Sequence, residues 1–223
     1  MPIISVIILT LNSLKFIKPC LDSILNQDDN ELEIIVVDNG SVDGTAIFIK
    51  ENYPQVSLIQ NKLNLGAAGA RNQGIRAAKG EWILCLDSDT VLEKNFFYNI
   101  KNATKISAED VGIIQPKILQ TDQETIYSMG IVISCLRKFY DIGKGKKDSK
   151  QFNKSRYIFG ACSAAALYKK DMLGRIKQAT GYFDERFFFL FEDVDLSWRA
   201  QNQGWRVLFY PNAVGYHCGN SSA

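Results

Sequence analysis

A regular alternation of apolar runs and helix-forming segments over the first ninety residues limits the fold more than any other feature of this sequence. Runs rich in β-branched and aliphatic residues predict four strands, over residues 5–11, 32–37, 56–59 and 82–86. Segments between them predict helices over about 16–25, 43–52 and 67–79. Strands that are apolar along their whole length, each followed by a helix, indicate a mostly parallel sheet covered on both faces.

Helix ends in this half carry residues that are typical of caps. Asn12 and Ser13 stand where an N-cap of the first helix is expected, because their side-chain oxygens can accept hydrogen bonds from free N–H groups. Gly80 is expected to end the third helix as its C′ residue.

The second half is less regular and is expected to form a smaller, acceptor-side part of the same domain. We predict a helix from near Glu192 to Gly204 and a last strand that Pro211 stops. Because there is no repeat or linker, we expect one catalytic domain over residues 1–223, with a nucleotide-binding half over 1–90 and an acceptor-side half over 91–223. Further strands are predicted over 111–119, 125–133, 156–159 and 161–168, with a polar loop over 141–156.

Two acidic motifs follow apolar runs. Asp87 and Asp89 come directly after the fourth strand, at the sheet edge where open α/β sheets bind ligands. Carboxylates so close together repel unless a cation lies between them, and a hard divalent cation can also hold phosphate oxygens. Asp193 follows an aromatic run over 187–191 that could wall an acceptor pocket. It offers a base for proton transfer, although acidic residues in a first helical turn are also ordinary partners of the helix dipole.

Other candidates are weaker on their own. Asp38 could accept hydrogen bonds from a ribose or a base, or could simply be a turn residue. The small residues from Gly66 open a helix whose N-terminus favours a diphosphate, with Arg71 adding a contact. The alternative is close helix–sheet packing with Arg71 in a surface ion pair. His217, the one histidine of the chain, is a candidate third metal ligand.

Several classes of protein are excluded or disfavoured. The first strand is not followed by G-x-G-x-x-G, and there is no P-loop motif, which argues against dinucleotide and P-loop enzymes. A net charge of +2 is too small to indicate a nucleic-acid partner. The five cysteines form no C-x-x-C pair, which fits a reducing cytosol. No apolar stretch reaches the roughly 18 residues of a membrane span.

A lysine- and glycine-rich segment over residues 144–150 is a local exception to the mild charge. A solvated, mobile loop is one interpretation of it. A basic lip that faces anionic lipid or a lipid-phosphate acceptor is the other.

Taken in order, these motifs resemble glycosyltransferase family 2, whose members are inverting enzymes with the GT-A fold. The likeness extends over nearly the whole chain, and the Gly181–Glu185 and Phe189–Asp193 segments look most like the rhamnosyltransferase-like branch. The motifs that carry it are residues 5–12, 36–41, 64–74, 87–89 and 192–196.

The resemblance implies a role for each candidate. Thr10 and Asp38 would hold the nucleoside with Gly66 and Arg71 nearby, Asp87 and Ser88 would lie toward the ribose, Asp89 and His217 would bind Mg²⁺ or Mn²⁺, and Asp193 would be the general base. Processive members carry Q-x-x-R-W. Here Gly204 stands at the arginine position of Gln201–Trp205, so we expect transfer of single sugars.

The implied function is transfer of a sugar from a UDP-, dTDP- or GDP-linked donor to a saccharide or lipid-linked acceptor, with inversion, in the biosynthesis of cell-surface polysaccharide. We expect it in the cytoplasm, at the inner face of the membrane, with peripheral membrane association and no nucleic-acid partner. One alternative is an inactive protein that binds sugar nucleotides. The other is a sugar nucleotidyltransferase, which should have a glycine-rich, basic loop after the first strand, and this chain lacks one.

Overall fold

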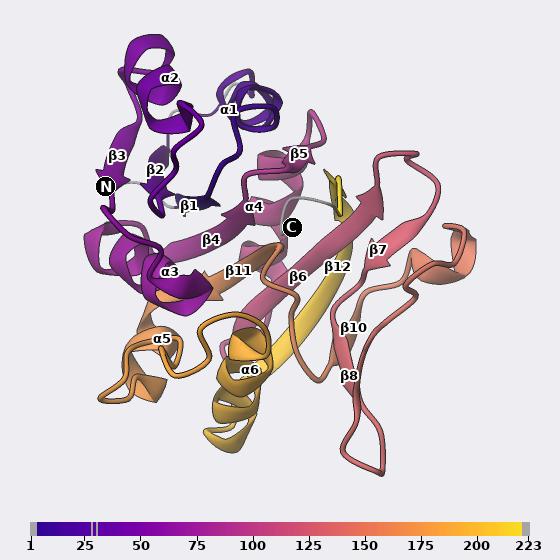
Figure 1. The fold of residues 1–223 in the computed structure, drawn as a ribbon. Coiled ribbons are helices and arrows are strands. Elements are labelled where there is room, and N and C mark those ends of the chain that lie inside the picture. The colour runs from indigo at the N-terminus through magenta and orange to yellow at the C-terminus, as the bar shows by residue number, and fades with distance from the viewer. Residues whose placement is uncertain (1–3, 28, 30, 220–223) are drawn as a thin grey trace.

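One mixed sheet forms the centre of the protein, in a computed structural model that describes residues 4–27, 29 and 31–219 (Figure 1). Its strand order is β3-β2-β1-β4-β11-β6-β12-β10, and β5 and β7 pair with β12 and β6. The strands are β1 (Ile4–Thr10), β2 (Leu32–Asp38), β3 (Ser57–Gln60), β4 (Trp82–Asp87), β5 (Thr90–Leu92), β6 (Val111–Gln120), β7 (Ile126–Ser128), β10 (Arg156–Ile158), β11 (Ala165–Lys169) and β12 (Arg206–His217). A separate two-stranded hairpin consists of β8 (Ile131–Ile133) and β9 (Phe139–Asp141).

Helices cover both faces of this sheet, as the sequence predicts. Because side chains alternate along a strand, Val6 and Ile8 of β1 face one helical layer and Ile7 faces the other. The first layer contains α1 (Ile17–Leu25), α2 (Thr45–Asn52) and α4 (Phe96–Ile106). The second contains α3 (Gly66–Ala77), α5 (Lys170–Ile176) and α6 (Glu192–Asn202).

The sheet of residues 1–90 is parallel, and its register aligns the strand ends. Thr10 at the end of β1 is the partner of Asp38 at the end of β2. Leu9, one residue earlier, is the partner of Asp87 at the end of β4. Neighbouring strands lie about 4.8 Å apart. The three polar residues therefore form a row along one edge of the sheet.

Several local predictions were wrong. Asn12 caps no helix: it has a left-handed backbone (φ 49°), and its Oδ1 accepts from Val42 N. Ser13 Oγ donates to Leu11 O, and α1 begins later, at Ile17. The third helix ends at Ala77, and Gly80 has no left-handed backbone; a Cβ there would lie 2.6 Å from Ser5 N, so close approach to β1 explains this glycine.

Two further predictions about the second half fail at a glycine and a proline. The strand predicted over 125–133 divides at Gly130, whose φ is +94°, into β7 and β8. Pro211 does not stop the last strand. The register of β12 against β6 shifts between Tyr210 and Val214, and a proline is tolerated in such a bulge because its missing N–H is not needed there.

The basic segment over 141–156 contains a short 3₁₀ helix, η1 (Lys150–Phe152). A buried side chain anchors it: Lys117 of β6 is 3% exposed, and its Nζ lies 2.8 Å from Asp148 Oδ2 and also donates to Asn153 Oδ1. That this segment is mobile in the unliganded protein stays a prediction. Within the described ranges, no helix is long and apolar enough to cross a membrane.

Candidate functional site

The row of polar residues at the strand ends is the first part of the site. Thr10 is 1% exposed and Asp38 is fully buried. Thr10 Oγ1 and Asp38 Oδ1 have no hydrogen-bond partner among the residues that the structure describes. Buried polar atoms are normally paired. Two adjacent unsatisfied oxygens therefore suit a ligand that donates hydrogen bonds.

Asp87, Asp89 and His217 come together because of one tight turn and one strand pair. The turn at Ser88 and Asp89 joins β4 to β5, and β5 pairs with β12 so that Thr90 is opposite His217. His217 Nε2 lies 3.2 Å from Asp89 Oδ1 and 3.7 Å from Asp87 Oδ2. One ligand atom from each of the three residues lies within 4.8 Å of the others. Ser88 turns away from this cluster, and its Oγ donates to Ser13 Oγ.

This cluster fits a hard divalent cation. Two carboxylates and one imidazole are the donor set that Mn²⁺ and related ions accept. Asp89 is 1% exposed and His217 is 4% exposed, so the acidic charge is withdrawn from bulk water. His217 Nδ1 accepts a hydrogen bond from Gly219 N at 2.8 Å, which leaves Nε2 to face the carboxylates. Burial opposes ionisation of Asp87, but Arg71 and His217 outweigh it and hold its pKa below the ordinary value.

Arg71 is part of the site but does not lie in a surface ion pair. Its side chain is 5% exposed, and its Nη2 donates to Asp87 Oδ1 at 2.9 Å. Its Nη1 donates to Glu192 Oε1, at the start of α6. The guanidinium therefore links the end of β4 to the start of α6. Two of its donors are already used by protein carboxylates, so the expected contact with a diphosphate would compete with them.

Gly66 lies against the aromatic segment over 187–191. It has a φ of +76°, and a Cβ there would lie 2.4 Å from Phe188 O. The next N–H, that of Ala67, donates to the same carbonyl at 2.8 Å. The beginning of α3 is thus occupied by Phe188, where the sequence suggested a free anion site.

Asp193 lies in the first turn of α6. Its Oδ1 accepts from Val194 N at 2.8 Å and its Oδ2 from Ser163 N at 3.3 Å. Ala164, the residue after Ser163, contacts the group formed by Asp87, Asp89 and His217, which we call the metal-ligand cluster. Its backbone O accepts a hydrogen bond from Asp87 N at 3.0 Å. Burial, followed by the neighbouring charge of Glu192, raises the pKa of Asp193 to about 6. A carboxylate of this pKa is a competent base near neutral pH.

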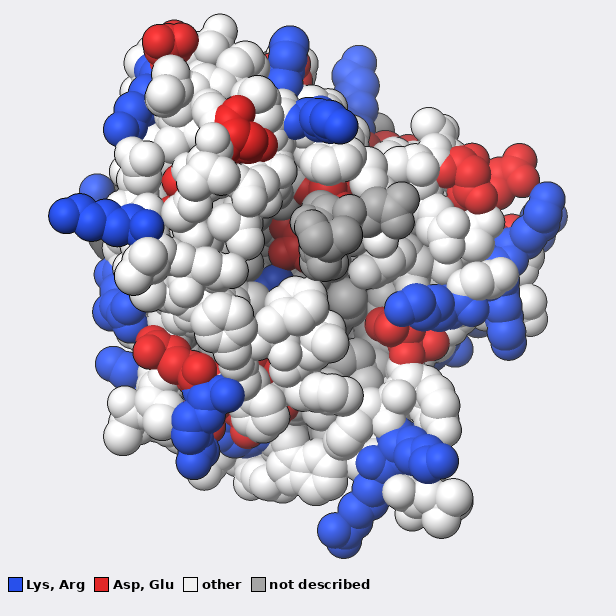
Figure 2. Space-filling view, viewed as in Figure 1, with Lys and Arg blue, Asp and Glu red and all other residues white. Residues whose placement is uncertain are grey.

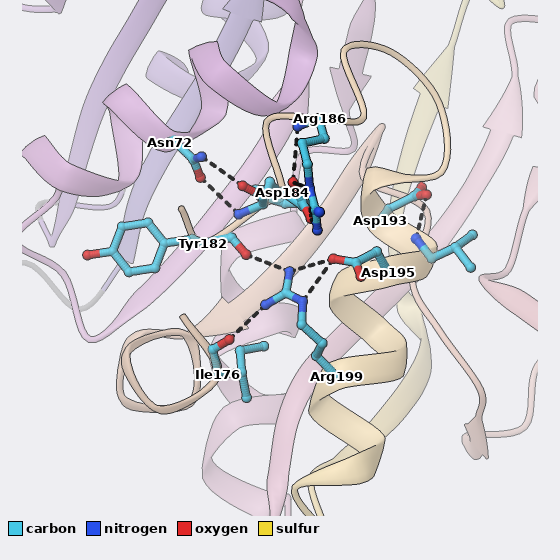
Figure 3. Close-up of polar contacts among 10 residues, drawn as sticks. Asn72, Ile176, Tyr182, Asp184, Arg186, Asp193, Asp195 and Arg199 are labelled. Atoms are coloured by element: carbon cyan, nitrogen blue, oxygen red, sulfur yellow. Dashed lines mark hydrogen bonds and ion pairs between the residues drawn. The ribbon is translucent and has the colours of Figure 1, made fainter. Parts of the chain in front are cut away.

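Side chains of α6 and α3 bind the segment between α5 and α6 (Figure 3). Arg199 donates to Ile176 O and Tyr182 O and pairs with Asp195 at 2.8 Å, which ties α6 to the segment after α5. Asn72 of α3 makes hydrogen bonds with both N and O of Phe183. Both α6, which carries Asp193, and α3 are therefore attached to the same segment, residues 176–183.

The segment over 187–191 exposes five consecutive large apolar side chains, from 37% at Phe187 to 57% at Phe191. Leu190 and Phe191 have left-handed backbones, with φ of 70° and 67°, which non-glycine residues rarely adopt. The sequence already identifies this segment as aromatic, but its left-handed backbone is seen only in the structure.

A family model described as "Glycosyl transferase family 2" matches residues 5–177 of this sequence, well over half of the chain. The chain belongs to glycosyl transferase family 2. The match begins in β1 and continues through the acidic turn at Asp89 and the Arg71 helix.

Curated relatives of this family 2 chain are longer than it is. A poly-beta-1,6-N-acetyl-D-glucosamine synthase of Staphylococcus epidermidis is 26% identical over 224 aligned residues, which cover 95% of this chain and 48% of that protein. A poly(ribitol-phosphate) beta-glucosyltransferase of Bacillus spizizenii is 37% identical over 114 residues, covering 48% of this chain and 18% of that protein. The chain thus spans about half the length, or less, of these relatives.

Solved structures confirm the fold of this family 2 chain as GT-A. A mannosyltransferase, PcManGT from Pyrobaculum calidifontis in complex with GDP-Man and Mn²⁺, has a TM-score of 0.69 at 21% identity, covering 100% of this chain and 58% of that one. TarS of Staphylococcus aureus has a TM-score of 0.65 at 21% identity, covering 97% of this chain and 36% of that one.

The sequence analysis did not identify three residues that the structure places in the site. Glu192 was part of an acidic motif, but its pairing with Arg71 was not expected. Ser163 contributes a backbone N–H, which has no sequence signal. Tyr127 stacks on His217 with ring centroids 4.2 Å apart, and only the pairing of β7 with β6 brings it there.

Proposed function

We propose that this chain transfers a sugar from a UDP-, dTDP- or GDP-linked donor to a saccharide or lipid-linked acceptor, with inversion at the anomeric carbon. The observation that carries the proposal is the convergence of Asp87, Asp89 and His217 beside Asp193, through the consecutive residues Ser163 and Ala164. Family membership supports the reaction class. The names of the staphylococcal synthase and the Bacillus glucosyltransferase support an acceptor that is a growing polymer.

On this proposal the strand ends bind the donor. Asp38 accepts hydrogen bonds from the nucleoside, and the hydroxyl of Thr10 accepts or donates one, because their buried oxygens lack partners among the described residues. Asp87 lies toward the ribose, held in place by Arg71. Asp89 and His217 would hold Mg²⁺ or Mn²⁺, and the ion would neutralise charge on the departing diphosphate. That PcManGT was crystallised with GDP-Man and Mn²⁺ supports a cation of this kind.

Asp193 is the proposed general base. Its carboxylate accepts the proton of the acceptor hydroxyl while that oxygen attacks the sugar, and a pKa of about 6 leaves most of it ionised at neutral pH. Attack on the face opposite the leaving group inverts the anomeric centre. The exposed aromatic side chains over 187–191, directly before α6, are suited to contact the C–H faces of an acceptor sugar.

We further propose single-sugar transfer by an enzyme of the rhamnosyltransferase-like branch. Gly204 stands where processive members carry arginine, and it has a φ of +81° at the end of α6. A non-glycine residue would be strained in this conformation, so the local backbone itself favours glycine. We place the protein in the cytoplasm, where the basic segment of the acceptor-side half would face the anionic inner surface of the membrane.

A thermal-shift screen of UDP-, GDP- and dTDP-sugars, each with and without Mn²⁺, tests donor binding. A ligand that binds only the folded protein raises the melting temperature, by an amount that grows with concentration over Kd. We expect one nucleotide to raise it, and only when Mn²⁺ is present. Absence of a shift with every nucleotide, for protein that is folded by circular dichroism, would contradict the proposed function.

A further inference from the structure

Positive charge is concentrated in one part of this chain. Residues 131–160, which form the β8–β9 hairpin and the segment leading into β10, contain eight Lys or Arg and two Asp, a net charge of +6. Since the whole chain carries +2, the remaining residues carry −4. We call residues 131–160 the basic hairpin surface. Figure 2 shows cationic side chains on the projecting lower right of the molecule, where Figure 1 places this hairpin.

Large apolar side chains are exposed on the same surface. Leu136 at the hairpin turn is 76% exposed, Tyr140 is 53%, Tyr157 is 52% and Val132 is 43%. Beside the hairpin is a hollow of about 620 Å³. Its lining includes Asp141, Lys144, Lys146, Arg156, Tyr157 and Phe159.

The cations here are not all neutralised by the protein. Lys144 pairs with Asp141 at 3.3 Å and Lys147 with Glu124 at 3.1 Å. Within the described part of the chain, no ion pair is formed by Arg137, Lys138 or Lys146. These three exposed charges are therefore available to an anionic partner.

The basic hairpin surface makes contacts with elements of the candidate site. Phe139 of β9 packs against Phe159, at 5.8 Å between ring centroids, and against Trp198 of α6, at 6.1 Å. Lys144 Nζ lies 5.3 Å from the ring centroid of Tyr127, which stacks on His217. Through Phe139 and Lys144, this surface thus contacts α6, which carries Asp193, and Tyr127, which stacks on His217.

We propose that the basic hairpin surface docks on an anionic lipid membrane, with Leu136 and Tyr140 among the headgroups and cations such as Arg137, Lys138 and Lys146 on lipid phosphates. Cations alone would fit a soluble polyanion equally well. A polyanion in water, however, would leave the apolar side chains exposed, whereas a membrane interface takes up both aliphatic and tyrosine side chains and attracts basic residues. The combination of charge and exposed apolar area thus favours the lipid surface.

This inference extends the proposed function by naming the surface that brings the enzyme to a lipid-linked acceptor. Docking itself requires no donor and no metal. Vesicle binding and sugar transfer to a soluble acceptor are therefore separate measurements. If the wild-type protein transfers sugar to a soluble acceptor but binds no anionic vesicles, the docking surface alone is contradicted. If it binds the vesicles but transfers no sugar, the proposed reaction alone is contradicted.

The test is co-sedimentation of the whole chain with phosphatidylcholine vesicles, with and without phosphatidylglycerol. We expect binding only to the anionic vesicles. The triple change Arg137→Ser, Lys138→Ser and Lys146→Ser should weaken it by about fivefold per cation removed, roughly a hundredfold in total. The control Lys94→Ser with Lys105→Ser removes two exposed lysines on and beside α4, and its loss of affinity per charge removed should be far smaller.

The apolar contribution separates a membrane from a soluble polyanion. Leu136→Gln should weaken vesicle binding several-fold, while Ile106→Gln, at a 71% exposed position on α4, should leave it unchanged. Soluble polyphosphate is the comparison ligand, and its affinity should be the same for the wild-type protein and for Leu136→Gln. Equal binding of wild type and the triple variant to anionic vesicles overturns the proposal. So does vesicle binding that depends on the cations but not on Leu136, because that result would indicate a polyanion site.

Discussion

Arg71 of α3 pairs with Glu192 of α6 across 121 residues of sequence, and both side chains are almost completely buried, at 5% and 6% exposure. The same guanidinium also holds Asp87. Burial opposes its charge, but the two carboxylates outweigh this effect and raise the pKa of Arg71 further. One cation thus neutralises a carboxylate at the end of β4 and another at the start of α6, beside the proposed base.

Replacing Arg71 with methionine should be strongly destabilising. It leaves Glu192 buried without a counter-charge, and breaking such a pair costs about 3–5 kcal/mol. Urea unfolding measures this cost. Arg76→Met on the same helix is the control, because Arg76 is 50% exposed and its Nη1 is 4.0 Å from Glu185. A cost near that of the control would mean that the buried pair contributes little. The double change Arg71→Met with Glu192→Met should cost less than Arg71→Met alone.

Asp89→Ala should abolish metal-dependent donor binding while the fold survives, because it removes one of the two carboxylates that face His217 Nε2. Calorimetric titration with Mn²⁺ and whichever nucleotide binds the wild-type protein gives the result. Asp171→Ala, in an exposed ion pair with Arg175, provides the control. An unchanged nucleotide affinity in the presence of Mn²⁺ would place the metal elsewhere.

Asp193→Asn should leave donor binding nearly intact and lower transfer by roughly a hundredfold or more, the scale of lost general-base catalysis. The protonated carboxyl cannot accept a proton, so the wild-type kcat/KM should rise with pH and level off above about 6, the pKa of this group. If transfer persists at the wild-type rate in Asp193→Asn, the base is another residue, and Glu192 and Asp195 are the next to test.

The same substitution has an expected effect on stability. Because burial raises the folded-state pKa of Asp193 from 3.8 to about 6, its ionised form opposes folding above that pH. This penalty disappears as the pH falls toward 3.8. Asp193→Asn should therefore raise the melting temperature near neutral and alkaline pH, with the gain shrinking in acid. A gain that does not depend on pH would show that ionisation of Asp193 is not its cause.

Gly66→Ala tests the contact between α3 and the aromatic segment. The new Cβ would lie 2.4 Å from Phe188 O on a left-handed backbone, so we expect a cost of about 1–3 kcal/mol and displacement of the segment. Gly174→Ala in α5 is the matched control. It meets nothing within 4 Å and should be neutral or stabilising by about 1 kcal/mol. Denaturant unfolding gives the change in the free energy of unfolding for both variants. Equal changes would show that the Phe188 backbone moves away from the new Cβ at little cost.

The parallel half of the fold could be predicted because each strand and helix there has its own local pattern. β1, β2 and β4 are apolar throughout, and their ends follow from the sequence, so the row of Thr10, Asp38 and Asp87 was also predictable in outline. α4 was missed although Phe96, Phe97, Ile100 and Ala103, all buried, recur at helical spacing after Asn95. This signal was present in the sequence.

Other features have no local signal. The pairing of Arg71 with Glu192 depends on how α6 packs against α3. β12, which ends at His217, continues past Pro211 only because its pairing with β6 contains a bulge there. Gly66 lacks a side chain, as glycines beside a bound phosphate do. In the structure, however, Phe188 O occupies the space where a Cβ would be. Small residues at a helix start indicate that something approaches closely, but not what it is.

The hydrogen bond from Gly219 N to His217 Nδ1 has a consequence for metal uptake. A neutral imidazole carries one proton, and with Nδ1 as an acceptor that proton resides on Nε2. A cation that binds Nε2 needs the other tautomer, in which Nδ1–H would point at the Gly219 amide. Binding of an ion at Nε2 would therefore break this hydrogen bond, so that the backbone amide of Gly219 would report whether the ion is bound.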